Sequence, residues 1–438
     1  MVKSFFLKSG LFIYAAFIIS LLIYSGLVTP AKKREDIFKC LLPINKISEI
    51  SGTVCSSPVK LKKSKFYSVN FRVKSVTGKN SEKSSAQGKI TLFLPEEDVE
   101  ALFPGKLFSA AKKNKAFIYD EGADICVRGK FFSKKENSSS DIIFKGNEIL
   151  KSSWNNDFWG KIKYFRAIFR LKLKRLLFSW KDSGALLLAL ITGMREYTDE
   201  KLSSLFRQAG LSHILALSGM HLMLFRKITS FFNLRFFGKR NISLLIEIFV
   251  ISVFVFFAGL SPSLLRAFLC SLCSIILNWL GFKNVKMTEI LSFSFLIHLI
   301  ILPEHYKNAG FILSYSALFG ILLLSDFINS KTVKILPETI SSSFSASFSA
   351  QIFTMPVSLL LFKSFAPVGI ISSVIVSPII TFFIYSGIFL IILCLIFPFF
   401  SDFSAFFMKI LYNLIEFLVL LFSKFKIISI NRGKHELA

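Results

Sequence analysis

Apolar runs long enough to cross a lipid bilayer constrain the fold of this chain more than any other feature. The runs lie at residues 5–28, 205–225, 241–258, 262–281, 287–302, 308–325, 340–362, 366–384, 385–400 and 403–423. A helix needs about 20 mostly apolar residues to span the hydrocarbon core. We therefore predict a membrane α-helical bundle of about ten spans, with a boundary between two of them near Tyr385–Gly387.

The segment 31–157 has a different character, because long apolar runs disappear and Lys, Ser and Gly become common. Tyr67, Val69, Phe71 and Val73 alternate with polar residues, which is the pattern of a half-buried strand. Shorter alternations recur between glycine-rich turns. We predict an all-β domain inserted after the first span. The expected organisation is an anchor (1–30), the β domain (31–157), basic amphipathic helices (158–200), the polytopic bundle (201–425) and a tail (426–438).

The net charge of +27 has two explanations. It indicates polyanionic neighbours, or it reflects the excess of Lys and Arg in the cytoplasmic loops of membrane proteins. The loops 226–240, 282–286 and 326–338 and the tail are rich in these residues, whereas the alternate loops hold only Lys307 and Lys363. This asymmetry predicts a protein of the bacterial cytoplasmic (inner) membrane with both termini inside and the β domain outside.

Residues 161–181 form a basic amphipathic helix on a helical wheel. Its basic stripe comprises Lys163, Arg166, Arg170 and Lys174, and an apolar stripe runs beside it. We expect the helix to lie in the membrane interface with this stripe at the head groups. A second interpretation is that the stripe guides a polyanion toward the bundle.

The run 205–225 carries an unusual number of polar residues: Arg207, His213, Ser218, Gly219 and His221. Ionisable groups within a membrane usually face a bundle interior or a water-filled cavity. His213 and His221 are separated by about 80° around a helix, so both can face one lumen. The alternative is that these polar residues only hold neighbouring helices together.

Arg266 is another cation within an apolar run. Pro262 suits the first turn of a helix, which would place Arg266 one turn into its span. There it would bind phosphate or pair with a carboxylate, for which Glu247 and Glu416 are available.

The six cysteines do not predict a metal site. Cys270 and Cys273 form a C-x-x-C inside an apolar run, which favours packing. Cys55 and Cys126 each lie in a predicted strand and form a possible disulfide if the β domain is outside the cytoplasm.

Several segments together resemble the ComEC competence protein family, whose members form the channel for transforming DNA in the cytoplasmic membrane. They are ALLLALITGMREYTDEKLSSLFRQAG (185–210), GLSHILALSGMH (210–221), AGLSPSLLRAFL (258–269) and GFILSYSALFGILLL (310–324). The insert, with GTVCSSP (52–58) and DICVRGKFF (124–132), looks like the external OB-type domain of that family.

The resemblance implies a channel that conducts single-stranded transforming DNA into the cytoplasm. Carried over by position, its channel residues are Gly210, His213, Ser218, Gly219, His221, Gly259, Ser261 and Arg266; we add Arg207. The expected partners are single-stranded DNA, the lipid bilayer, an external DNA receptor, a separate nuclease and a cytoplasmic ATP-driven translocase. No Walker-type G-x-x-x-x-G-K-[ST] motif occurs, so the energy is expected from a partner or from the membrane gradient.

The chain also departs from the family pattern. Many members end in a metallo-β-lactamase-like domain, and no H-x-H-x-D-H run occurs among the five histidines here. We therefore expect a conduit rather than an enzyme, without a cofactor. Gly281 is followed by Phe282 where the family usually has Arg, and Ser372 and Ser373 replace an expected Asn.

An OB-type barrel holds single strands by aromatic stacking and basic grooves. The candidates here are Lys65, Phe66, Tyr67, Phe71, Arg72, Lys74, Arg128 and Lys130. Tyr67 and Phe71 share one strand face, and we expect both to pack inside.

Three other functions remain open. An intramembrane serine hydrolase would use Ser218 as nucleophile and His298 as base. A transporter of another polyanion or of a small solute would use the same bundle. A decayed competence protein would insert without conducting. The sequence predicts no oligomeric state.

Overall fold

The computed structural model describes residues 11–25, 38–61, 64–100, 117–132, 142–195, 197–216, 219–236, 240–282, 285–425 and 428–429. The chain divides into two compact units. We call Lys32–Ser179 the β unit, and Met1–Ala31 with Trp180–Ala438 the helical unit.

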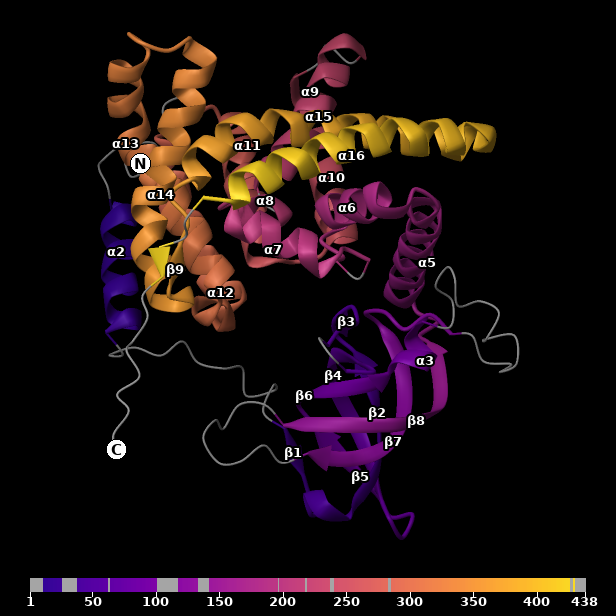
Figure 1. Cartoon of the computed structure of the whole chain (residues 1–438). Helices are drawn as coiled ribbons and strands as arrows, with labels where there is room; N and C mark the ends of the chain where they lie inside the picture. The colour runs from indigo at the N-terminus through magenta and orange to yellow at the C-terminus, as the bar shows by residue number, and fades with distance from the viewer. Residues whose placement is uncertain are drawn as a thin grey trace, which may run out of the picture. The chain divides into compact units, whose positions relative to one another are not determined.

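Five strands of the β unit close into a ring in the order β2, β4, β6, β8, β7 and back to β2 (Figure 1). All of these pairings are antiparallel except β6 with β8. The ring strands are β2 (Ile47–Val54), β4 (Phe66–Gly78), β6 (Lys89–Pro95), β7 (Ala123–Phe132) and β8 (Ile143–Trp154). The shorter elements are β1 (Lys39–Cys40), η2 (Ile44–Lys46), β3 (Val59–Lys60), β5 (Lys83–Gln87) and α3 (Glu96–Val99).

The alternation in β4 sets the inside of this ring. Tyr67, Val69, Phe71 and Val73 are buried, which confirms the prediction that Tyr67 and Phe71 pack inside. Tyr67 donates its hydroxyl to Oε1 of Glu100 over 2.5 Å, so the ring is buried with its polar atom satisfied. The residues that alternate with these four point outward, because successive side chains of a strand point to opposite faces.

The last element of the β unit is α5 (Phe158–Ser179), which packs against β8. The residues predicted as a basic interfacial segment (158–200) are therefore divided, because α6 (Lys181–Thr192) belongs to the helical unit.

Among its described residues, the helical unit contains five helices that are long and apolar enough to cross a membrane: Pro262–Trp279, Ala309–Thr332, Glu338–Phe362, Gly369–Ile396 and Pro398–Ser423. Shorter apolar helices lie at Ile13–Ile23, Ile242–Ala258 and Met287–Ile301. The unit comprises α2 (Leu11–Tyr24), α6, α7 (Glu200–Gln208), α8 (Ser212–Leu215), α9 (Gly219–Phe236), α10 (Arg240–Ala258), α11 (Pro262–Trp279), α12 (Met287–Ile301), η4 (Pro303–Lys307), α13 (Ala309–Thr332), α14 (Glu338–Phe362), β9 (Ser364–Phe365), α15 (Gly369–Ile396), η5 (Pro398–Phe400), α16 (Ser401–Ser423) and β10 (Ile428–Ser429). The protein is thus a membrane helical protein with a β domain.

The predictions for three of the spans are wrong. The run 205–225 is not one helix, because α7 ends at Gln208, α8 begins only at Ser212 and α9 begins at Gly219. Gly210 lies in the first turn between them with φ of +73°, which ends a helix. The runs 366–384 and 385–400 form the single helix α15. Gly387 is no boundary: a Cβ there would lie 2.5 Å from Cδ1 of Leu187 on α6, so its role is close packing.

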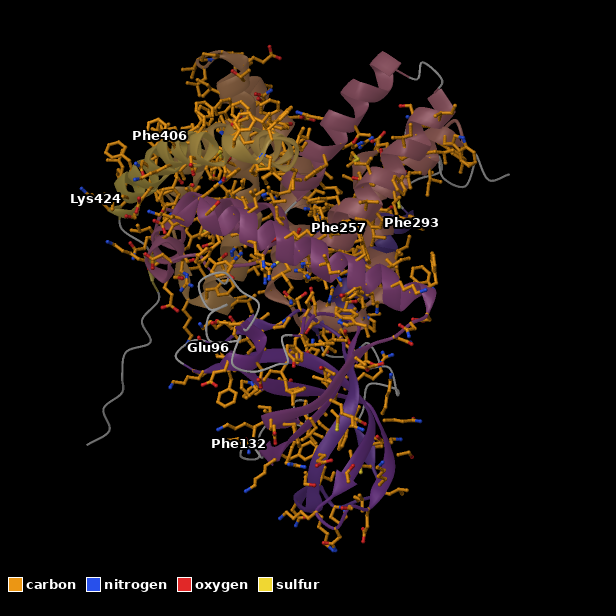
Figure 2. All side chains as sticks on the ribbon, turned by 90° about the vertical axis from the view of Figure 1, so that its right-hand side faces the viewer. Glu96, Phe132, Phe257, Phe293, Phe406 and Lys424 are labelled. Atoms are coloured by element: carbon orange, nitrogen blue, oxygen red, sulfur yellow. The ribbon has the colours of Figure 1, made fainter. Side chains whose placement is uncertain are left out.

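Helix α11 is the centre of the bundle, because it contacts α9, α10, α12 and α13. One apolar cluster joins Leu222, Ile251 and Leu264, and another joins Cys270, Ile290 and Phe311. Helix α14 packs between α13 and α15, and α16 packs on α15, α6 and α7. Two of these long helices contain an internal proline, Pro356 in α14 and Pro378 in α15. Phe406 projects from the exposed surface of α16 (Figure 2).

Candidate functional site

One face of the first half of α11 carries polar side chains. Ser263, Arg266 and Cys270 follow one another at helical spacing, and all three bond to neighbouring helices. Ser263 donates to the Gly310 carbonyl (3.2 Å), and Nε of Arg266 donates to Oγ of Ser314 (3.1 Å) on α13. Sγ of Cys270 lies 3.1 Å from Oγ of Ser294 on α12. We call these five side chains, Ser263, Arg266, Cys270, Ser294 and Ser314, the polar seam.

The start of α11 is fixed by residues that the sequence had singled out. Ser261 is the N-cap, and its Oγ accepts a hydrogen bond from the Leu264 amide (3.3 Å). Pro262 occupies the first turn as predicted, since it needs no amide partner there. Gly259 has φ of +99°, a conformation that glycine adopts without a steric penalty. Together they place Arg266 one turn into the helix.

The guanidinium of Arg266 also lies beside the first residue of α9. A Cβ on Gly219 would be 3.3 Å from Nη2 of Arg266 and 3.2 Å from Cβ of Ala267. A Cβ at position 219 would therefore crowd both groups, which would have to shift by a few tenths of an ångström. The amino end of a helix carries a partial positive charge, so α9 and Arg266 create positive potential at the same point.

No carboxylate in the described parts of the chain neutralises Arg266. Its only described hydrogen-bond partner is the neutral Ser314. The expected partner Glu247 forms an ion pair with Arg226 instead, and this pair joins α10 to α9. The expectation of a carboxylate partner is thus not met by Glu247. Ser314 itself was missed in the sequence, although it lies in a segment that carried the family resemblance.

The polar residues of the run 205–225 do not share one helix. Arg207 and His213 are exposed on α7 and α8, whereas His221 is buried in α9. Ser218 lies outside the described residues. The predicted arrangement of His213 and His221 on one helical face is wrong, because α8 ends at Leu215 and His221 lies in α9, which begins at Gly219.

Gly210 packs directly on another glycine. A Cβ at Gly210 would lie 2.6 Å from Cα of Gly369 at the start of α15. Ser372 donates to the Ala209 carbonyl over 2.7 Å beside this contact, so the serine that replaces an expected Asn has a structural role. Arg195 donates to the Leu215 carbonyl over 2.8 Å and holds α8, a contact that the sequence did not signal.

The basic stripe of α5 faces the β unit. Arg166 donates to Oε2 of Glu121 (2.6 Å), and Arg170 donates to Oδ2 of Asp120 (3.2 Å) and to Ser57. Lys163 lies 3.8 Å from Oε1 of Glu121. Arg166, Arg170 and Lys174 are all buried, which corrects the expectation that the whole stripe lies at the head groups. These charges hold α5 on the barrel.

The outer face of β4 and β6 combines aromatic and basic side chains. Phe66 and Arg72 point outward from β4, and Phe93 points outward from β6. Lys145, paired with Phe93 from β8, holds its Nζ 4.8 Å from the Phe66 ring centroid. We call Phe66, Arg72, Phe93 and Lys145 the aromatic–basic face.

The other basic candidates of the β unit have different surroundings. Lys74 pairs with Asp124 (3.0 Å), and Arg128 pairs with Glu49 (2.8 Å). Lys65 and Lys130 are exposed. Phe132, which the sequence did not single out, is 64% exposed on the outside of the β unit (Figure 2).

The predicted disulfide between Cys55 and Cys126 is not formed, and both thiols are free. The register pairs Cys126 with Ser51, four residues before Cys55. Four residues along a strand span about 13 Å, which is beyond the reach of a disulfide. Burial raises the pKa of both thiols.

The surroundings of His298 do not support the hypothesis of a serine hydrolase. Its Nδ1 lies 3.3 Å from the Tyr315 hydroxyl, and its Nε2 lies 3.0 Å from Nδ1 of His305. Both ring nitrogens thus have partners that are not serines. A base needs a free nitrogen directed at its nucleophile.

Comparisons with known proteins place the chain in a family. The model of a family described as Competence protein matches residues 190–437. ComE operon protein 3 of Bacillus subtilis (strain 168) is 26% identical over 209 residues, which cover 47% of this chain and 26% of that protein. An uncharacterized protein of Aquifex aeolicus (strain VF5) is 27% identical over 287 residues, covering 63% of this chain and 64% of that protein. The chain thus spans less than two thirds of either relative, and no solved structure shows a significant match. Because the family model covers more than half of its residues, the chain belongs to the Competence protein family.

Proposed function

We propose that this protein conducts a single strand of DNA through the cytoplasmic membrane during natural competence. The observation that carries the proposal is Arg266, a cation in the central helix of an apolar bundle that no described carboxylate neutralises. A DNA strand carries one negative charge per nucleotide, so its path needs positive potential without a site that holds it tightly.

The chemistry of Arg266 suits a passing phosphodiester. A guanidinium stays charged at all physiological pH values, and within a membrane such a group faces the bundle interior or a water-filled cavity. Its Nε is engaged with Ser314, while its two Nη groups have no hydrogen-bond partner among the described residues. Two such groups bind two oxygens of one phosphate. The amino end of α9 at Gly219 adds to the attraction.

We further propose that the β unit is an OB-like barrel on the outer side of the membrane and receives the strand. Its ring of five strands supports this, and OB-type barrels bind oligonucleotides on the face of their second and third strands. In the ring these positions belong to β4 and β6, which carry most of the aromatic–basic face. Aromatic rings stack on bases of any sequence, which suits a conduit.

The orientation and the partners are part of this proposal. The loop charges favour a β unit outside and an N-terminal anchor that begins in the cytoplasm. An external DNA receptor, a separate nuclease and a cytoplasmic ATP-driven translocase would complete the pathway. The α5 helix would then hold the β unit close to the membrane interface, with Phe158 and Trp159 among its exposed aromatic residues.

The test is DNA uptake in the native host after deletion of the gene and complementation. Labelled DNA protected from external nuclease is measured in the cytoplasm. Arg266→Gln should lower uptake by about ten-fold or more, since a charge-assisted hydrogen bond contributes roughly 1.5–3 kcal/mol. Lys331→Gln is the control, because it removes one exposed positive charge from α13.

Uptake at the wild-type level by Arg266→Gln, with the same amount of protein in the membrane, would overturn the role of Arg266. Normal uptake in the deletion strain would overturn the channel itself. Competition by unlabelled polyphosphate as strong as that by DNA would favour a transporter of another polyanion.

A further inference from the structure

Two histidine rings meet at the connection between α12 and α13. His298 lies in the last turn of α12 with no exposed surface, and His305 lies half-buried in η4. Nε2 of His298 is 3.0 Å from Nδ1 of His305, and Nδ1 of His298 is 3.3 Å from the Tyr315 hydroxyl. The Phe311 ring lies nearly perpendicular to the His298 ring, and the two centroids are 4.9 Å apart.

A contact between two imidazole nitrogens requires one proton between them. In the neutral pair, either His298 Nε2–H donates to His305 Nδ1, or His305 Nδ1–H donates to His298 Nε2. One added proton, on the outer Nε2 of His305, leaves this bond intact, because His305 then donates to neutral His298. A second proton places hydrogens on both facing nitrogens. The bond is lost, and two like charges lie side by side.

The charges around the pair oppose double protonation. From α13 the pair faces Tyr315, and from α11 the guanidinium of Arg266 and the thiol of Cys270 act on that tyrosine. From η4 itself come Glu304 and Lys307, and the ammonium of Lys307 lies over the Tyr306 ring. Helix α2 also packs on α12, and its residues Leu11–Tyr24 include no charged side chain. Burial lowers the pKa of His305, which Glu304 offsets in part.

A series of hydrogen bonds links the α12–α13 connection to the polar seam. The backbone amide of Asn308 donates a hydrogen bond to the His305 carbonyl over 2.9 Å. Its side chain caps α13 by accepting from the Gly310 amide (2.8 Å), and the Gly310 carbonyl accepts from Ser263 (3.2 Å). Movement of the connection would therefore reach the start of α13, near Arg266 and Ser314.

We propose that His298 and His305 form a proton-binding latch that ties the α12–α13 connection to the bundle and releases it on acidification. The latch goes beyond the proposed conduction of DNA and does not depend on it. When both rings carry a proton, repulsion and the lost hydrogen bond free η4. The start of α13 then separates from α11 at Ser263. An unperturbed histidine changes charge between about pH 5 and 8, and burial together with the neighbouring ring places the second protonation of this pair below that range.

The test measures hydrogen exchange of the purified full-length protein in detergent at pH 7.5 and at pH 3.5, corrected for the intrinsic pH dependence of exchange. Amides in residues 299–310 should exchange about five-fold faster or more at pH 3.5. His305→Gln should abolish this pH response, because the glutamine amide can still bond to His298 but does not titrate. Residues 340–350 of α14 serve as the internal reference.

Equal corrected rates at the two pH values in the wild-type protein would overturn the proposal. So would a His305→Gln variant that keeps the full pH response. If that variant does not fold, the wild-type protein with isotope-labelled histidine decides by its own titration. Two of the five histidines must then titrate as a coupled pair in two separate steps, and five independent single steps would refute the latch.

Discussion

Arg170 donates from Nη1 to Oδ2 of Asp120 over 3.2 Å, and only 7% and 12% of the two side chains are exposed. The pair connects the middle of α5 to the segment that leads into β7. It explains why α5 belongs to the β unit although its sequence is that of an amphipathic interfacial helix. An ion pair out of water is costly to form, yet still more costly to break from one side.

We expect Asp120→Asn to destabilise the β unit by about 3–5 kcal/mol, because it leaves the Arg170 charge buried without its partner. The double variant Asp120→Leu with Arg170→Leu should lose less, since no buried charge remains. Thermal unfolding of the purified protein measures both. Lys74→Met is the control for an exposed pair, and its effect should stay below about 1 kcal/mol. An Asp120→Asn variant as stable as Lys74→Met would contradict the importance of the buried pair.

The same carboxylate predicts a dependence of stability on pH. Burial alone would raise the pKa of Asp120, but Arg170, the Ser57 hydroxyl and the Glu121 amide outweigh it and hold the pKa below the ordinary value of 3.8. A depressed pKa stabilises the fold above pH 3.8, and this stabilisation is lost as the pH falls through the lower folded value. Unfolding followed from pH 6 downward, to about pH 2, should show this loss. Asp120→Asn should lack that part of the pH dependence, and an identical profile would refute the assignment.

Gly210 and Gly281 allow a matched test of close packing. Both have positive φ, +73° and +84°, so alanine carries a similar backbone penalty of about 1–2 kcal/mol at each. A Cβ at Gly281 would meet no atom of the described residues within 4 Å, whereas at Gly210 it would lie 2.6 Å from Cα of Gly369. Gly210→Ala should therefore lower the melting temperature in detergent clearly more than Gly281→Ala. Equal shifts would mean that α7 and α15 adjust without cost.

The aromatic–basic face makes a prediction about binding. Phe66→Ala should weaken the binding of a fluorescent single-stranded oligonucleotide to the purified protein by about 1–3 kcal/mol, the usual contribution of one stacked base. Lys145→Gln should reduce the salt dependence of binding by about one charge. Phe158→Ala on α5 removes another exposed aromatic side chain and should leave affinity unchanged. An effect of Phe158→Ala equal to that of Phe66→Ala would argue against a defined face.

The sequence predicted those features that depend on neighbouring residues. The alternation of Tyr67 and Phe71 is local, as is the helix start at Ser261 and Pro262, and both were correct. Features decided by distant partners were missed. Arg166 and Arg170 meet carboxylates 45 and 50 residues earlier in the chain, which no helical wheel reveals. Gly387 resembled a turn because its packing partner, Leu187, lies in a different helix.

The internal prolines of α14 and α15 have a mechanical consequence. Proline has no amide hydrogen, so Pro356 and Pro378 leave the carbonyls of Ile352 and Val374 without their helical donors. Bending at these two points breaks no further backbone bond. Since α14 and α15 pack on each other, we expect a bend at one proline to be transmitted to the other helix.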